Sequence, residues 1–582
     1  MEINKLSLIV GGEAGEGITR SGFLFAKACL RGGLYAIGVN DYQSLIRGGH
    51  NFYIVRVGDE EIYSQRGTID LLLALNKETI LLHKDQLVSG GGIVYDGEEV
   101  ELSDEDLNRD DLRIYSVPLK TIVKKAEGKR IMRNSVALGA ALALLDLEID
   151  PLKEVLEDTF NAEVADMNMK VAEQGFEYLR NNYEIDDFPY KLQKTNRAGK
   201  WRMFLTGNEA VGMGAIKAGC KFYAAYPMTP ATDLLHFMAS HQRDHGMVVM
   251  QSESEISAIN MVAGASFAGV RAMTATSGGG FCLMSEGLGM TGMTENPVVI
   301  MVAQRPGPST GLPTYSGQGD MRFIIHASQG EFPRVVIAPG DVEECFYKTM
   351  EAFNLAEKFQ LPVLLVTDKY LVESHESVAP FDQDQVKIDR GLLLTEEEYT
   401  GTEPYKRHRF TEDGISLRAV PGSKGAIVRT NADEHDERGY TTEDLELTTQ
   451  MNNKRFKKME ALTEELKKYD TTKFYGPEEA EATILGWGST KGPIREALKI
   501  LSREGAKVNY LQVVFLDPFP TEKVSSVLKS AAKTIVVENN VTSQLSGLIR
   551  EHCLITVDHK ILKYDGRPFD PYPLSRRIME LL

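Results

Sequence analysis

Glu255 is a carboxylate at the point where a predicted strand ends and a predicted helix begins. It follows the short run 248–252 and precedes an apolar stripe at helical spacing from Ala258 to Ala265. The dipole of a helix favours a negative charge at its N-terminus, so a carboxylate at this place is usually only a cap. Taken alone, Glu255 would be interpreted in this way.

Two further side chains are predicted to lie at the same edge of a sheet. Thr229 stands between Pro227 and Pro230, directly after a predicted strand, and the prolines hold the backbone around its hydroxyl stiff. Arg305 follows the apolar run 298–302, and a guanidinium there suits a substrate that carries a carboxylate. Thr229 could equally belong to a plain loop, and Arg305 could equally hold the carbonyls of its own loop.

Three other motifs are candidates for binding sites or contacts. The turn GGEAGEG, residues 11–17, could cradle a phosphate, but its glutamates would repel one and Arg20 occupies the last glycine position of a GxGxxG pattern. We therefore interpret it as a tight turn between a strand and a helix. DYQSLIRGGH, residues 41–50, is typical of an exposed loop at a subunit contact or over a ligand. DEHDERG, residues 433–439 around His435, is interpreted as a solvated loop rather than a metal site.

Apolar strand-like runs alternate with helical patterns along most of the chain, which predicts parallel sheets flanked by helices. The fold class is therefore α/β with several doubly wound domains, which bind ligands at the carboxyl ends of their strands. Three such units are expected, joined by a polar linker and a loop-rich extension. Their predicted ranges are 1–185, 186–200 for the linker, 201–385, 386–475 for the extension, and 476–582.

The composition narrows the class of protein. The chain has 582 residues, of which 42% are apolar and 25% charged, and its net charge of -18 disfavours nucleic acid as a partner. The five cysteines form no CxxC pair, which argues against a cluster or zinc site on this chain and for a reducing, cytoplasmic location. The N-terminus does not read as a signal peptide, and no apolar run is long enough for a membrane span.

Several motifs occur in the order found in one enzyme family. They are GNEAVGMGAIKAG, YPMTPAT, QSESEISAINMVAGASFAGVRAMTATSGGG, QRPGPSTGLPT and NADEHDERG. Together they resemble the alpha subunit of 2-oxoacid:ferredoxin oxidoreductases, and the resemblance continues through LGWGST and VVENN. Residues 1–185 resemble the gamma subunit of the same family, so the chain looks like a gamma–alpha fusion. The resemblance implies that 201–385 is a pyrimidine-binding-type domain of thiamine enzymes and 476–582 a transketolase C-terminal-like domain.

The resemblance also implies cofactors and roles. The expected reaction is the oxidative decarboxylation of a 2-oxoacid to acyl-CoA and CO2, with coenzyme A as co-substrate and electrons passed to ferredoxin. Glu255 corresponds to the glutamate that hydrogen-bonds the aminopyrimidine ring of thiamine diphosphate. Tyr226 and Pro227 belong to the cofactor-binding segment, and Thr229 and Arg305 match positions that contact the substrate carboxylate.

Two features of thiamine and iron–sulfur enzymes are missing from the sequence. No GDG motif is present to hold the diphosphate and Mg²⁺, and no cysteines are spaced for a [4Fe-4S] cluster. Both are expected on a separate beta subunit, in a heterodimer or a dimer of heterodimers, and this chain is assigned no metal.

The acyl side chain of the substrate stays open. Relatives that use 2-oxoglutarate carry a basic residue after GLPT, where this chain has Tyr315, Ser316, Gly317 and Gln318. Pyruvate, branched-chain and aryl 2-oxoacids therefore also fit. Three alternatives to this function stay open: a thiamine-dependent dehydrogenase or transketolase-like enzyme without ferredoxin, a nicotinamide-dependent dehydrogenase, and a non-catalytic assembly subunit.

Overall fold

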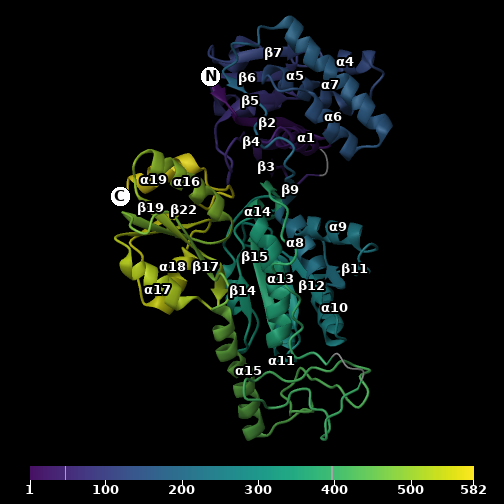
Figure 1. Cartoon of the computed structure of the whole chain (residues 1–582), viewed down its shortest axis with the longest axis vertical. Helices are drawn as coiled ribbons and strands as arrows, with labels where there is room; N and C mark the ends of the chain where they lie inside the picture. Colours follow the sequence, from purple (N-terminus) through teal and green to yellow (C-terminus); the bar gives the residue numbers. More distant parts are fainter. Residues whose placement is uncertain (46–47, 395–397) are drawn as a thin grey trace. The chain divides into compact units, whose positions relative to one another are not determined.

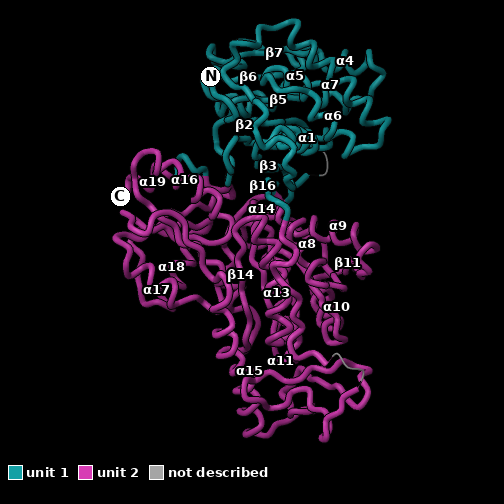
Figure 2. The backbone as a smooth tube through the Cα atoms, in the orientation of Figure 1, with its two compact units in different colours: residues 1–205, 374–380, 570–574 teal, residues 206–373, 381–569, 575–582 magenta. Residues whose placement is uncertain are grey.

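The computed structural model describes residues 1–45, 48–394 and 398–582. It divides into two compact units: residues 1–205 with 374–380 and 570–574, and the rest of the chain (Figure 2). Each unit is described by itself. The α/β class with several doubly wound domains is confirmed, while the five finer domain ranges stay predictions.

Unit 1 contains an eight-stranded sheet in the order β7-β6-β5-β2-β4-β3-β16-β9. Its strands are β2 (Lys5–Glu13), β3 (Tyr35–Asp41), β4 (His50–Gly58), β5 (Ile69–Ala74), β6 (Leu87–Asp96), β7 (Arg113–Val117), β9 (Met203–Thr206) and β16 (His375–Val378). The prediction of a parallel sheet was wrong for half of it. Strand β4 runs antiparallel to β2 and β3, because only residues 42–49 separate β3 from β4 and a parallel crossover needs about a dozen residues or more.

Helix α1 (Ile18–Arg31) follows the tight turn predicted between a strand and a helix. Helices α5 (Arg133–Leu144) and α7 (Ala162–Asn182) pack closely through small residues, and α5 is buried throughout. A methyl group on Gly139 would lie 1.9 Å from the carbonyl oxygen of Ala172, so glycine is required where the two backbones meet. No transmembrane candidate occurs among the helices of the described ranges.

Unit 2 is built around a seven-stranded sheet in the order β11-β10-β12-β13-β15-β14-β20 (Figure 1). Its strands are β10 (Phe222–Ala225), β11 (Val248–Gln251), β12 (Ala272–Thr276), β13 (Val298–Gln304), β14 (Val335–Ile337), β15 (Pro362–Asp368) and β20 (Phe515–Asp517). All are parallel except β20, which comes from the C-terminal part of the chain and pairs antiparallel with β14.

Helices cover both faces of this sheet. Helices α10 (Glu255–Phe267) and α11 (Gly278–Met293) share a core with Val298, Ile300 and Val302 of β13. The alternate residues of β13 point to the other face, where α8 (Gly207–Lys217) and α13 (Val342–Phe359) pack together. Because every strand ends in a loop that leads to a helix, the carboxyl ends of the parallel strands form one polar edge.

The C-terminal segment, residues 471–569, adds a second sheet in the order β17-β19-β18-β21-β22. Its strands are β17 (Thr472–Tyr475), β18 (Ala482–Gly486), β19 (Val508–Val513), β21 (Thr534–Glu538) and β22 (His559–Leu562). One hydrophobic core runs through both sheets of unit 2, from Ile300 and Val336 to Leu485, Leu511 and Val536.

Within unit 2, buried charges connect the loop-rich extension to the seven-stranded sheet and its helices. Glu295, at the end of α11, accepts from Lys454 of α15 (Leu445–Leu466) at 2.7 Å and pairs with Lys458 and His408. Burial lowers the pKa of Lys458 to about 7, although Glu295 opposes this shift. Removing one partner of such a cluster leaves an uncompensated buried charge, so the extension is held firmly against the sheet.

Candidate functional site

The carboxyl edge of the sheet in unit 2 collects the residues singled out from the sequence. Tyr226 and Thr229 follow β10, Glu255 follows β11, and Arg305 follows β13. These strands are parallel neighbours or next neighbours in the sheet. The loops after them therefore gather at one edge, as expected for a doubly wound domain.

Glu255 is the first residue of α10, and it is not the cap. Ser254 is the N-cap, and its hydroxyl accepts from the backbone N–H of Ser257 at 3.3 Å. The Glu255 side chain is buried, with 3% of its surface exposed, and its Oε1 atom has no hydrogen-bond partner in the part of the chain that the structure describes. A buried carboxyl oxygen without a partner costs about 1–3 kcal/mol, which a simple cap would avoid.

The carboxyl of Glu255 lies over the first turn of α11. A methyl group on Gly280 would come 2.5 Å from Oε1 of Glu255 and 2.1 Å from Oγ1 of Thr276. Only glycine at this position lets the carboxyl enter the turn. The glycine-rich stretch after β12 therefore makes room for Glu255.

Arg305 and Thr229 are brought together by a hydrogen bond to the backbone. Nη1 of Arg305 donates to the backbone carbonyl oxygen of Thr229 at 2.8 Å. Arg305 thus holds a carbonyl of a neighbouring loop, and its other donors form no hydrogen bond with the described residues. Burial lowers the pKa of this guanidinium from its ordinary value, but Arg305 still carries its charge at neutral pH.

Tyr226 and Pro227 begin the loop that carries Thr229. Tyr226 is 39% exposed and Pro227 is half-buried, so both are accessible from solvent. The next residue, Met228, accepts through Sδ from the hydroxyl of Ser277 at 3.2 Å. This contact joins the loop after β10 to the loop after β12.

Asp320 is a further carboxyl of this edge, which the sequence analysis missed. Its backbone N–H donates to Oε1 of Gln304 at 2.9 Å, and a methyl group on Gly278 would lie 2.1 Å from its Oδ2 atom. Asp320 therefore touches the residue before Arg305 and the first residue of α11. Burial raises the pKa of Asp320 to about 6. It lies at the end of a long glycine-rich loop, and no periodicity in the sequence indicates where that loop returns.

The C-terminal segment holds this loop in place through Gln318, which is fully buried. The Gln318 side chain donates to the Trp487 carbonyl at 2.9 Å and accepts from the Asn539 N–H at 3.0 Å, and the Gln318 backbone N–H donates to the Asn539 carbonyl at 2.8 Å. The segment around LGWGST and VVENN thus positions the loop that ends at Asp320.

The residues after GLPT make contacts within unit 2. The Tyr315 ring lies under the guanidinium of Arg567, 3.9 Å from its centroid, and the Ser316 hydroxyl donates to Asp368 at 3.0 Å. These contacts hold the loop, and the identity of the acyl side chain stays open.

The motifs that were not assigned a ligand form contacts within the chain. Glu16 of GGEAGEG pairs with Arg133, and Gly17 precedes α1 at a φ of 78°, which a tight turn requires. His435 is buried, so the interpretation of its motif as a solvated loop was wrong for this residue: its ring bonds to the carbonyl of Asp433 at 2.9 Å and lies 4.1 Å from the His408 ring in a tilted arrangement. Of the motif 41–50, residues 46 and 47 lie outside the described residues.

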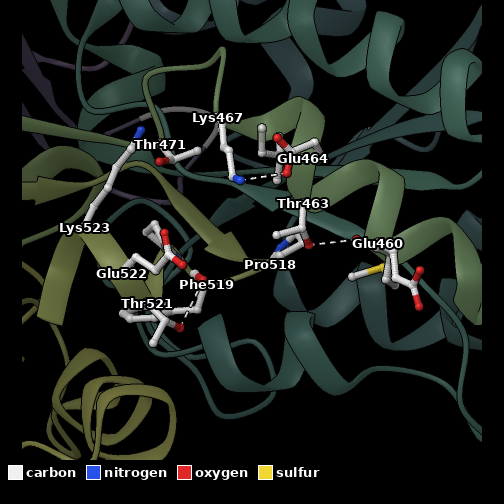
Figure 3. Close-up of a pocket in the computed structure, with 13 residues that line it drawn as sticks. Glu460, Thr463, Glu464, Lys467, Thr471, Pro518, Phe519, Thr521, Glu522 and Lys523 are labelled. Carbon is white, nitrogen blue, oxygen red and sulfur yellow. Dashed lines mark hydrogen bonds and ion pairs between the residues drawn. The ribbon is translucent and has the colours of Figure 1, made fainter.

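A groove of about 730 Å3 opens elsewhere in unit 2 (Figure 3). It lies between the second half of α15 and the segment before α17 (Thr521–Ser530), with Phe519 and Pro520 on one side and Thr463 and Glu464 on the other. None of the residues named above for the carboxyl edge lines this groove, so the two features are separate.

Three family models match successive parts of the chain. Residues 213–454 match pyruvate flavodoxin/ferredoxin oxidoreductase, thiamine diphosphate-binding; residues 7–178 match pyruvate ferredoxin/flavodoxin oxidoreductase; and residues 480–568 match core domain II of pyruvate:ferredoxin oxidoreductase. The matched models describe an oxidoreductase with a thiamine diphosphate-binding domain, which in this chain includes strands β10 to β15 of unit 2.

Full-length relatives narrow this class. The chain is 34% identical to the alpha subunit of a 2-oxoacid:ferredoxin oxidoreductase from Sulfolobus sp., over 99% of this chain and 97% of the relative. It is 35% identical to the 2-oxoglutarate synthase subunit KorA of Methanocaldococcus jannaschii, over 65% of this chain and 99% of that protein. The solved 2-oxoglutarate:ferredoxin oxidoreductase from Magnetococcus marinus, with 2-oxoglutarate, coenzyme A and succinyl-CoA bound, superposes with a TM-score of 0.90 at 35% identity and full coverage of both chains.

The chain belongs to the 2-oxoacid:ferredoxin oxidoreductase family, as an alpha subunit. The predicted family is confirmed, and with it the prediction of an enzyme. A thiamine enzyme that does not use ferredoxin is not favoured.

Proposed function

We propose that this subunit activates thiamine diphosphate through Glu255 and binds the 2-oxoacid carboxylate through Arg305 and the loop of Thr229. The observation that carries the proposal is the buried Oε1 atom of Glu255, which has no partner among the described residues. A ring nitrogen of the aminopyrimidine would supply that partner. The residues present therefore fit the cofactor.

When bound, thiamine diphosphate supplies the carbon that attacks a 2-oxo group and takes up the electrons left after CO2 departs. The residues of this chain bind and orient the cofactor and the substrate. The Glu255 carboxyl would hydrogen-bond the cofactor ring in a buried site, where such a bond is strong. The first turn of α11 fixes the Glu255 carboxyl, and Tyr226 and Pro227 offer accessible surface on the loop after β10.

Arg305 is the group that selects a carboxylate. One of its nitrogens is held by the Thr229 carbonyl, which fixes the plane of the guanidinium and leaves its remaining donors for a ligand. Because the guanidinium is partly buried, an ion pair with a substrate carboxylate is less screened there than at an open surface.

The diphosphate, its Mg²⁺ and a [4Fe-4S] cluster are assigned to a beta subunit, and the active site is shared between the two chains. The sequence lacks both a GDG motif and clustered cysteines. Exposed apolar side chains support a subunit contact near the carboxyl edge: Met250 towards the end of the edge strand β11, and Ile256 next to Glu255. Ferredoxin is the proposed electron acceptor and coenzyme A the acyl acceptor.

The test is turnover by the chain co-purified with its beta subunit. Pyruvate, 2-oxoglutarate, a branched-chain and an aryl 2-oxoacid are each assayed with coenzyme A and methyl viologen, and then with ferredoxin. We expect reduction that requires both coenzyme A and a 2-oxoacid. Reduction with none of the four substrates, by a complex that contains thiamine diphosphate and its cluster, would contradict the proposal.

A further inference from the structure

The backbone amides at the N-terminus of α11 receive no side-chain cap from the N-cap residue Ser277. Ser277 precedes the helix, but its hydroxyl donates to Met228 and accepts no bond from the first turn. The first amides of a helix lack intrahelical partners and attract negative charge. No residue within the described ranges caps α11 with a side chain.

Two carboxyls flank this turn. Asp320 lies over Gly278, and Glu255, with its buried and unpartnered Oε1 atom, lies over Gly280. Between them, a methyl group on Gly279 would meet no described atom within 4 Å. The turn thus presents open space between two acids, beside the loops of Thr229 and Arg305.

Asp320 is joined to the proposed substrate site by a closed series of contacts. Asp320 bonds through its backbone to Gln304, the neighbour of Arg305, and Arg305 bonds to Thr229. Thr229 follows Met228, which bonds to Ser277, and Ser277 precedes the glycine under Asp320. The Asp320 carboxyl itself forms no hydrogen bond with the described residues.

The charged and titratable groups around Asp320 do not neutralise it. From α11, Cys282 faces Asp320. From α10, Glu255 lies over Gly280, two residues beyond the glycine under Asp320. From the loop after β13, Arg305 is bound to Thr229, and from α12 (Met321–His326) Arg322 pairs with Glu551 at 3.2 Å. None of these groups forms an ion pair with Asp320.

We propose that Asp320 belongs to the substrate site and that its negative charge opposes binding of the 2-oxoacid carboxylate. Substrate binding is then coupled to uptake of one proton by Asp320. Since burial raises the pKa of this carboxyl to about 6, the coupling falls in the neutral range. This inference rests on the proposed function, because it needs an anionic substrate next to Arg305.

The consequence is a Michaelis constant that depends on pH. Below pH 6 Asp320 is neutral and the substrate meets only the positive charge of Arg305. Above pH 6 the ionised carboxylate weakens binding, by up to about tenfold per pH unit while only the protonated form binds well. The turnover number depends on it less, because the charge acts on binding of the substrate.

The test compares Asp320→Asn with the unmodified complex, using the best 2-oxoacid of the panel and methyl viologen between pH 5.5 and 8. We expect the Michaelis constant of the unmodified complex to rise at least fivefold from pH 6 to pH 8. In Asp320→Asn it should change less than twofold over the same range. Parallel pH profiles in the two complexes would overturn the inference.

A matched control is Asp517→Asn. Burial also raises the pKa of Asp517 to about 6, but Asp517 lies near Arg334 at the amino end of β14, away from the carboxyl edge. This variant should keep the original pH profile. A flattened profile in Asp517→Asn would show that the effect does not come from the site.

A second measurement covers the case in which Asp320→Asn does not assemble. The best 2-oxoacid of the panel is titrated calorimetrically into the Glu255→Gln complex at pH 7 in two buffers of different ionisation enthalpy. We expect uptake of about half a proton or more per site; binding without proton uptake would overturn the inference. Absence of turnover by the unmodified complex would instead refute the proposed function, so the two failures are distinguishable.

Discussion

The Glu255 carboxyl packs so closely against Gly280 that no side chain fits there: a methyl group on Gly280 would lie 2.5 Å from Oε1 of Glu255. Gly280→Ala should therefore displace the carboxyl or open α11, at a cost of about 1–3 kcal/mol, as for other overpacked interiors. We expect a lower melting temperature of the isolated subunit. Gly279→Ala is the control, because its methyl group meets open space and alanine favours a helix. Equal melting temperatures for the two variants would contradict the close contact.

Arg305→Ala should raise the Michaelis constant for the 2-oxoacid about ten- to a hundredfold, with a smaller effect on the turnover number, because a charge-assisted pair with the substrate is lost. Arg305→Lys should recover only part of this, since lysine lacks the planar fork. The exposed Arg243→Ala is the control for loss of one positive charge. An unchanged Michaelis constant in Arg305→Ala would remove Arg305 from the substrate site.

Gln318→Ala should loosen the loop that ends at Asp320. The substitution leaves the Trp487 carbonyl and the Asn539 N–H without their partner, which costs about 1–3 kcal/mol per buried group. We expect faster cleavage by a broad-specificity protease between residues 306 and 320, in the subunit without substrate. The exposed Gln329→Ala should keep the original cleavage rate. Equal rates for both variants would show that the C-terminal segment does not hold the loop.

Ionisation of Asp517 is expected to make the stability of the folded chain depend on pH. Its pKa is about 6 in the folded chain, mainly through burial and despite Arg334, against an ordinary value of 3.8. Since the folded state holds this proton more tightly, its contribution to stability is full below pH 4 and is lost as the pH rises through 6, by roughly 1–3 kcal/mol. The melting temperature of Asp517→Asn, relative to the unmodified chain, should therefore be higher at pH 7.5 than at pH 4. A difference that does not vary with pH would refute this.

Local patterns in the sequence were enough to place most elements and the carboxyl edge. A helix was predicted after the turn 11–17, where α1 begins, and Glu255 lies at the start of α10 as expected. These predictions depend on short-range periodicity, which burial of one helix face enforces. The antiparallel pairing of β4 was missed, because strand direction depends on how a loop closes rather than on the strand's own residues.

Contacts across long separations could not be inferred from the residues. Asp320 meets Gly278 only because Gln318 is held by residues more than 150 positions away, and no spacing rule describes that return. The bond of Arg305 to the Thr229 carbonyl was missed for the same reason. Side-chain partners in loops depend on the complete packed structure.

The role of Glu255 is tested most directly by Glu255→Gln in the complex with the beta subunit, with Glu253→Gln as control. Glu253 is two residues away and exposed, and it bonds to Ser257, so the control removes a carboxylate from the same segment. Initial rates of 2-oxoacid- and coenzyme A-dependent viologen reduction are measured at saturating thiamine diphosphate. We predict a rate lowered by about a hundredfold or more in Glu255→Gln and a near-original rate in Glu253→Gln. Near-original turnover by an assembled Glu255→Gln complex would contradict the central claim.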